Sequence, residues 1–165
     1  MKAIYMIIVL ALNLTVLAED KGSQVKNDIK ALSQATYTNK PETILKYTMP
    51  KIIEMMGGEE KAKITLSTIL NKMQYITLDS LTFPKEPSFI EGTKYEYVII
   101  PTLSIVSANG QRIESLNFQV GQRLKSTEKW YYIEGSRVNQ NTIPIYLPEL
   151  PKNQKLPEFY RKKIK

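Results

Sequence analysis

The spacing of apolar residues divides the chain into a part with helical period, up to about Tyr75, and a part with strand-like alternation after it. In the first part Val25, Ile29 and Leu32 fall on one helical stripe. Further helices are expected to begin at about Pro41 and to cover residues 51–56. Helices followed by strands favour an α+β fold.

The predicted helix over about residues 59–74 has the clearest helical pattern in the chain. Its apolar side chains are spaced so that they share one wide face, of the kind that packs on a sheet. These residues are Ala62, Leu66, Ile69, Leu70 and Met73. We therefore expect this helix to lie on the sheet formed by the second part of the chain.

The dipeptide Asn109-Gly110 predicts a tight hairpin, because both central positions of a type I′ turn need a positive φ. A tight turn makes every pair of opposed residue numbers sum to 219, so Leu103 faces Leu116. Pro101 cannot donate a ladder hydrogen bond, which predicts a bulge or an outward-facing position and a bent strand. The alternation predicts one buried face and one wet face. The expected buried face carries Tyr95, Ile99, Pro101, Leu103, Leu116, Phe118, Val120 and Leu124.

Further strands are expected at residues 75–83 and 129–133. After Gly135, prolines recur among apolar residues, which predicts an extended strap over apolar surface, because proline disfavours helix interiors and central strands.

The N-terminus resembles an export signal in its pattern. Lys2 precedes an apolar run from Ala3 to Leu17, and Ala18 stands before an acidic residue, so residues 1–18 are predicted to be a signal peptide. The run is too short, and too polar in places, to span a bilayer comfortably, so we expect it to be removed rather than to anchor the protein. No stable membrane span is then expected in the remaining chain. We expect a periplasmic or extracellular protein with one α+β domain over residues 19–150.

Most of the net charge of +7 lies near the C-terminus, where residues 151–165 are expected to form an extended basic tail. Such a tail is typically solvated, and weak attraction to anionic lipid or cell-wall polymer is its functional alternative. The chain contains no cysteine and no histidine, which argues against the familiar serine, cysteine and zinc hydrolase mechanisms. No phosphate loop or calcium loop is present, so we expect no cofactor and no metal. Basic and aromatic residues do not interleave, so no nucleic-acid partner is expected.

Short segments of the chain carry a resemblance to a known superfamily. They are Tyr47–Lys61, Val98–Thr102, Lys129–Ile133 and Leu147–Leu150. Through them, residues from about 28 to 157 resemble uncharacterised exported bacterial proteins of the nuclear transport factor 2-like superfamily. That resemblance implies N-terminal helices packed in the concave face of a strongly curved antiparallel sheet, in a cone shape. Such relatives often carry a glycine-rich acidic turn before the tryptophan, where this chain has residues 126–128 as Ser-Thr-Glu.

The superfamily includes isomerases, dehydratases and non-catalytic binding modules, so the residues must decide among these functions. Asp79 and Glu54 are weak catalytic candidates, as carboxylates that could serve as a base. Tyrosines combine an apolar ring with a polar tip, which suits a ligand pocket. The candidate ligand-binding residues are Tyr47, Tyr95, Tyr97 and Trp130, although each also suits ordinary core packing.

The sequence leaves several functions open. The first is a non-enzymatic exported protein that binds a small apolar ligand or a partner protein through the pocket of the cone, with homodimerisation as an open alternative. The second is an enzyme of the isomerase or dehydratase type that uses a pocket carboxylate and a tyrosine. The third is an envelope protein–protein interaction module that uses the strap and the basic tail.

Overall fold

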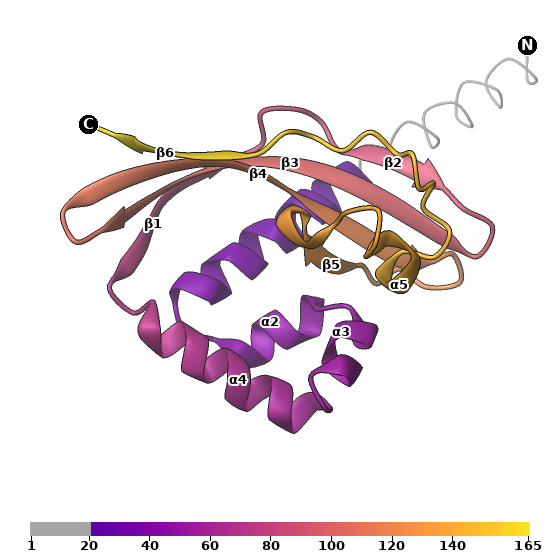
Figure 1. The fold of residues 1–165 in the computed structure, drawn as a ribbon, viewed down its shortest axis with the longest axis horizontal. Coiled ribbons are helices and arrows are strands. Elements are labelled where there is room, and N and C mark those ends of the chain that lie inside the picture. Colours follow the sequence, from indigo (N-terminus) through magenta and orange to yellow (C-terminus); the bar gives the residue numbers. More distant parts are fainter. Residues whose placement is uncertain (1–20) are drawn as a thin grey trace, which may run out of the picture.

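The computed structural model describes residues 21–165, so the signal peptide predicted for residues 1–18 lies outside the described residues. Residues 21–37 are helical, and they are followed by α2 (Pro41–Tyr47), α3 (Pro50–Met55) and α4 (Glu59–Lys72) (Figure 1). Next come the strands β1 (Ile76–Thr82), β2 (Ser88–Glu91), β3 (Tyr95–Ala108), β4 (Gln111–Leu124) and β5 (Tyr131–Glu134). The chain ends with a 3-10 turn η1 (Gly135–Arg137), α5 (Ile143–Tyr146) and β6 (Tyr160–Ile164). The predicted α+β class is confirmed.

The strands form one six-stranded antiparallel sheet centred on the long hairpin of β3 and β4. β1 and β2 both pair with β3, while β5 and β6 both pair with β4. The predicted register is confirmed, because Leu103 lies opposite Leu116 and Ala108 lies opposite Gln111. The turn has the expected backbone, with φ of 51° at Asn109 and 72° at Gly110.

Of the two alternatives predicted at Pro101, a bulge and an outward-facing amide position, the bulge is absent from the hairpin. The pairing of β3 with β4 continues without a shift through Pro101, which lies opposite Phe118. On the other side of β3, Pro101 falls between the residues that pair with β2, up to Ile99, and those that pair with β1, from Leu103. The missing N–H therefore causes no break in the hairpin. The sheet's irregularity lies instead in β1, where the register shifts between Leu78 and Ser80.

Both faces of the sheet are covered near its middle, so the prediction of one wet face is wrong there. Helical residues 21–37 place Val25 and Ile29 against Val98, Ile100 and the buried Trp130 and Tyr132, on what we call the helix face. On the opposite face, which we call the α5 face, Tyr97, Ile99, Phe118 and Val120 pack against Ile143, Leu147 and Leu150. The run Val98–Ile100 is apolar at every position because both faces of β3 are buried there.

Helix α4 was predicted to lie on the sheet, and it does not. It packs against α2 and less extensively against α3, forming a small cluster of Leu70 with Ala35 and Ile44. Ala62 and Leu70 are buried, but Ile69 of the same predicted face is 47% exposed. The helices α2, α3 and α4 thus form a layer beside the sheet rather than upon it (Figure 1).

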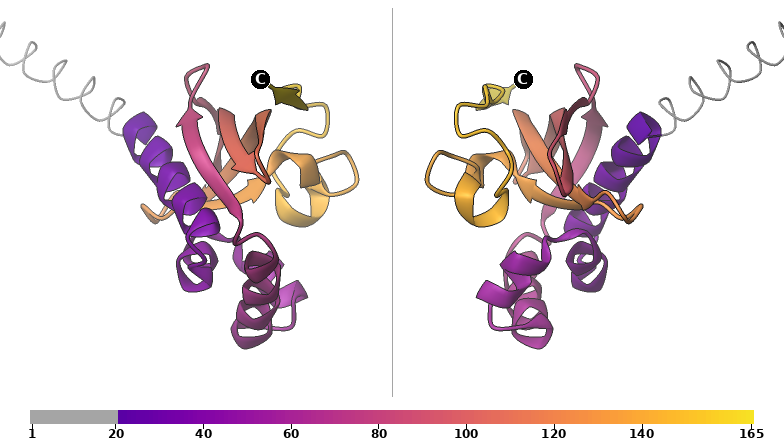
Figure 2. Two further views of the ribbon diagram at one scale, coloured as in Figure 1. Left: turned by 90° about the vertical axis from the view of Figure 1, so that its left-hand side faces the viewer. Right: turned by 90° about the vertical axis from the view of Figure 1, so that its right-hand side faces the viewer.

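The chain after Gly135 crosses the α5 face and then returns along the sheet. Figure 2 shows the helical residues 21–37 on one side of the sheet and α5 on the other. The prediction that this whole segment is extended is wrong, because the segment contains η1 and α5. Its basic end forms β6, which pairs with β4 from Arg112 to Leu116. Lysine and arginine on such an edge strand discourage pairing with other chains. The domain boundary at residue 150 stays a prediction.

Candidate functional site

A groove of about 590 Å³ opens on the α5 face where β3 begins, β4 ends and β5 begins. Its floor follows from the hairpin register, because Tyr95 pairs with Leu124 and Gln122 pairs with Tyr131. Alternate residues of a strand share a face, so these side chains line one surface. The walls come from the α2–α3 junction and from α5. The lining residues are Met49, Pro50, Lys51, Glu54, Tyr95, Gln122, Arg123, Leu124, Thr127, Lys129, Tyr131, Ile145, Tyr146 and Pro148.

The α2–α3 wall exists because Pro50 restarts the helix after α2. Proline fits the first helical turn, where its missing N–H is not needed, and it stands there at the start of α3. The preceding Met49 is 2% exposed and packs in the core of the α5 face, which anchors the junction beside the sheet. Lys51 and Glu54 lie one turn apart on α3 and form an exposed ion pair of 3.0 Å.

The α5 wall is held in place by Glu149. Its carboxylate accepts backbone N–H bonds from Tyr95 at 3.1 Å and Lys94 at 2.9 Å. These bonds hold the pKa of the Glu149 carboxyl below its ordinary value, the Tyr95 N–H having the largest effect. The backbone N–H of Glu149 donates to the hydroxyl of Tyr97 at 3.0 Å. The strap is therefore fixed to the start of β3, next to the groove floor.

The groove has a largely apolar lining with lysines at its rim. The ammonium of Lys129 lies 4.9 Å from the centroid of the Tyr131 ring, and that of Lys94 lies 5.5 Å from the centroid of the Tyr95 ring. Ile145 is 49% exposed on the α5 wall, where it adds apolar surface to the groove. An apolar groove with few polar groups is the usual form of a small-molecule site.

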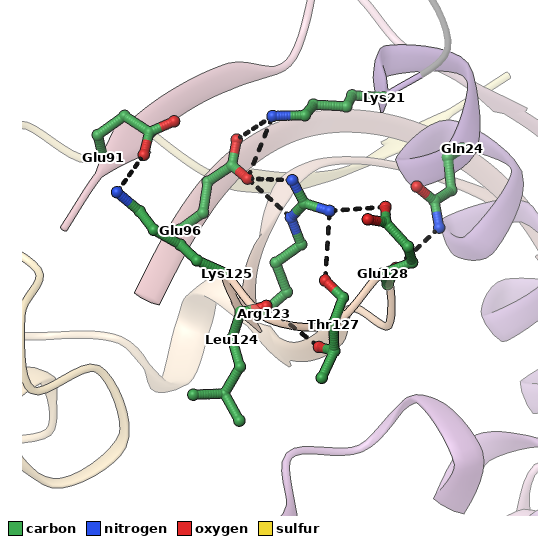
Figure 3. Close-up of polar contacts among 9 residues, drawn as sticks. All are labelled: Lys21, Gln24, Glu91, Glu96, Arg123, Leu124, Lys125, Thr127 and Glu128. Atoms are coloured by element: carbon green, nitrogen blue, oxygen red, sulfur yellow. Dashed lines mark hydrogen bonds and ion pairs between the residues drawn. The ribbon is translucent and has the colours of Figure 1, made fainter. Parts of the chain in front are cut away.

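Behind the floor, on the helix face, a network of ion pairs lies at this end of the sheet, with Glu96 and Arg123 buried at its centre (Figure 3). The guanidinium of Arg123 lies between Glu96, to which its Nε donates at 2.7 Å, and Glu128, at 2.9 Å. Lys21 at the start of the described helix also binds Glu96, at 3.0 Å. Arg123 stands 5.1 Å from the centroid of the Trp130 ring. The network ties the N-terminal helix to the two strands that form the groove floor.

The structure separates the predicted ligand-binding residues. Tyr95 lines the groove, and its ring lies 6.3 Å from that of Tyr97, centroid to centroid. Tyr97 is fully buried, and burial raises the pKa of its hydroxyl to about 12. Trp130 is 1% exposed in the core of the helix face. Tyr47 packs against the Tyr132 ring, away from the groove lining.

The predicted carboxylates also lie far from one another. Asp79 sits at the β1 irregularity, where it accepts a hydrogen bond from the Ser107 hydroxyl at 2.7 Å and pairs with Arg112. Glu54 lines the groove, but its side chain is 70% exposed and paired with lysine. Neither carboxylate is both desolvated and directed into an apolar pocket, the arrangement that raises the pKa of a catalytic base.

Asp28, which was not among the predicted site residues, is more desolvated than Glu54 and has a raised pKa. Asp28 accepts a hydrogen bond from the Tyr132 hydroxyl at 2.8 Å, between the N-terminal helix and the sheet. Burial raises the pKa of the Asp28 carboxyl, and burial together with this carboxylate raises the pKa of Tyr132 and of neighbouring Tyr47. The pair joins the helix to β5 and does not line the groove.

Within residues 21–165, no group of three or more acidic side chains is close enough to hold a metal ion. Over the same residues, none of the helices combines the length and the apolarity that crossing a membrane requires. Neither family models, nor curated proteins, nor solved structures give a match to this chain.

Sequence reasoning missed most of the groove lining. The hairpin register predicted Leu124 opposite Tyr95 correctly, and the same alternation along β4 could have placed Gln122 beside it. The contributions of Lys51 and Ile145 depend on where α3 and α5 dock, and no local periodicity encodes that placement.

Proposed function

We propose that this protein is a non-enzymatic binding protein whose groove on the α5 face holds a small apolar ligand. The observation that supports this most directly is the groove itself, with Tyr95, Tyr131, Tyr146 and Ile145 exposed to it at one end of the sheet. Burying such side chains against a ligand stabilises the complex by about 25 cal/mol for each Å² of apolar area removed from water. A volume of about 590 Å³ falls in the usual range for small-molecule sites.

The proposal includes export and a relationship to the nuclear transport factor 2-like superfamily. The signal-like residues 1–18 support export. The order of elements supports the relationship, because helices precede a long hairpin and an aromatic strand. The groove proposed here lies on the face of the sheet opposite the helical residues 21–37, not between that helix and the sheet.

The isomerase or dehydratase alternative is less well supported. It needs a desolvated carboxylate facing the ligand, and among the described residues the groove contains one acid, the exposed and paired Glu54. Asp28 has a raised pKa and a tyrosine partner, but its position between helix and sheet is outside the groove lining. Binding without catalysis therefore fits the described groups better.

Native mass spectrometry of the purified protein tests this function. We expect a retained small molecule that is released on unfolding. Ile145→Trp should fill the groove from the α5 wall and abolish retention. Ile64→Trp is the matched control, because Ile64 is also exposed, at 66%, but lies on α4 away from the groove lining. If both variants retain the molecule equally, the groove is not its site.

A further inference from the structure

The charged groups around the groove are unevenly paired, and this bears on the ligand that the proposed function requires. Lys51 is neutralised by Glu54, at 3.0 Å. Arg123 is neutralised by Glu96 on the helix face, at 2.7 Å. Lys129, in contrast, lines the groove and has no carboxylate oxygen within 4.0 Å among residues 21–165. Its positive charge is the uncompensated one in the lining.

A second lysine stands at the same end of the sheet. Lys94 precedes Tyr95, whose partner Leu124 ends β4, and its carbonyl accepts the N–H of Lys125. Among the described residues Lys94 also has no carboxylate oxygen within 4.0 Å, whereas Lys125 pairs with Glu91 at 2.8 Å. The Glu149 carboxylate, which accepts hydrogen bonds from the backbone N–H groups of Lys94 and Tyr95, is the opposing charge here. Two lysines against one carboxylate leave this end of the groove with a net positive charge, while its floor and its α5 wall are largely apolar.

Each of these unpaired lysines rests over a tyrosine ring of the groove floor. Lys129 lies over Tyr131 and Lys94 over Tyr95. An exposed ammonium on an aromatic ring gains only a modest stabilisation, and a lysine side chain is flexible. Both ammonium groups can therefore turn towards an anion at the groove mouth without breaking an ion pair.

We propose that the ligand is an amphiphile with one anionic head group, of the long-chain carboxylate class. Its apolar chain lies on the floor and the α5 wall, along Tyr95, Tyr146 and Ile145, and its carboxylate is held by Lys129 with Lys94 beside it. This inference rests on the proposed function of the groove and specifies the charge and shape of its occupant. A cationic amphiphile would meet unpaired positive charge and be disfavoured.

Isothermal titration of the purified protein with matched probes tests this proposal. The probes are dodecanoate and dodecyltrimethylammonium, both below their critical micelle concentrations, dodecanol below its solubility limit, and acetate as the head group alone. Because charge-assisted hydrogen bonds are stronger than neutral ones, we expect dodecanoate to bind about tenfold more tightly than dodecanol. We expect no measurable binding of acetate, since most of the affinity should come from the chain.

Substitutions locate the head group. Lys129→Gln should weaken dodecanoate binding by about three- to fivefold and leave dodecanol binding unchanged, and adding Lys94→Gln should remove the rest of the roughly tenfold preference. Lys72→Gln, on the exposed end of α4, is the matched control and should change neither affinity. Thermal melts of all variants establish that the fold is kept.

The outcomes separate this inference from the function on which it rests. If dodecanol and dodecanoate bind equally, the groove binds apolar ligands but the assignment of an anionic head group is wrong. If dodecanoate is preferred and the double lysine variant binds it normally, the head group lies elsewhere and the proposal also fails. If no twelve-carbon probe binds, the proposed function fails with it. Binding of acetate at the affinity of dodecanoate would indicate an anion site without a chain site, and would equally contradict the proposal.

Discussion

The buried pair of Glu96 and Arg123 allows a quantitative test of how the groove floor is held. The side chains are 3% and 8% exposed, and Nε of the arginine lies 2.7 Å from the carboxylate. Replacing Glu96 by Gln keeps the shape but removes the charge that faces the guanidinium. Breaking a buried pair by removing one partner costs about 3 to 5 kcal/mol, because the remaining charge stays out of water. Arg123 retains Glu128, so we expect the lower end, about 3 kcal/mol.

The same network supplies a matched control. Glu128 also binds Arg123, at 2.9 Å, but its side chain is 89% exposed. Glu128→Gln should therefore cost less than about 1 kcal/mol, the usual value of an exposed pair. The two substitutions are chemically identical and act on one guanidinium, but Glu96 also binds Lys21. Their difference therefore measures the effect of burial together with the loss of the Lys21 pair, whose contribution Lys21→Gln measures separately.

Urea unfolding followed by tryptophan fluorescence measures both values. The chain has a single tryptophan, Trp130, which is 1% exposed and next to the Arg123 guanidinium. Equal dependence of the unfolding free energy on urea in all variants would show that the same surface is exposed on unfolding. A cost below about 1 kcal/mol for Glu96→Gln, or costs that are equal for the two glutamates, would refute the argument that burial makes this pair important.

The other predictions concern the strap, the sheet and α4. Because the folded-state pKa of the Glu149 carboxyl is lowered, its contribution to stability should be present at neutral pH and lost as the pH falls through that pKa; the difference in Tm between the native protein and Glu149→Gln should therefore shrink from pH 7 towards acid, and a difference that grows would contradict this reasoning. Gly121→Ala would place a Cβ 2.7 Å from a core side chain and should cost about 1 to 3 kcal/mol. Gly22→Ala, in the helical residues 21–37 and with no atom within 4 Å of the new Cβ, should cost nothing and should stabilise by up to about 1 kcal/mol in the same urea assay. Leu70→Ala should cost about 2 to 5 kcal/mol and Ile69→Ala about 0.5 kcal/mol or less, and equal costs would mean that the face of α4 is wrongly assigned.

Local chemistry in the sequence predicted the parts of the fold that depend on neighbouring residues. The hairpin register followed from Asn109-Gly110, and the start of α2 followed from Pro41. The helix predicted over residues 51–56 was found one residue earlier, as α3. The stripe of Val25 and Ile29 was confirmed as a buried helix face.

The errors came from elements whose environment is set by distant parts of the chain. Strict alternation suggested a wet face, but the continuous apolar run at Val98–Ile100 carries the signature of burial on both sides. The short strand β2 and the basic strand β6 have little intrinsic pattern and form because β3 and β4 offer them an edge. Helix α4 has an apolar face wider than the surface that covers it, so periodicity alone could not name its partner.

The candidate site could be predicted only in part for the same reason. Tyr95 and Glu54 were identified from their residue types, and both line the groove. The buried network of Glu96 and Arg123 pairs residues 27 positions apart, and the hairpin register places them opposite each other. Each is a charged residue in a strand that alternation assigned to the wet face, so the sequence pattern concealed their burial.

The most direct test of the central claim is to map the site of dodecanoate by amide chemical-shift perturbation in the isotopically labelled protein. The account predicts shifts concentrated at Tyr95, Leu124, Tyr131 and Ile145, on the α5 face, which saturate with one ligand per chain. Shifts concentrated on the helix face around Val25 and Ile29, or no saturable shifts at all, would contradict it.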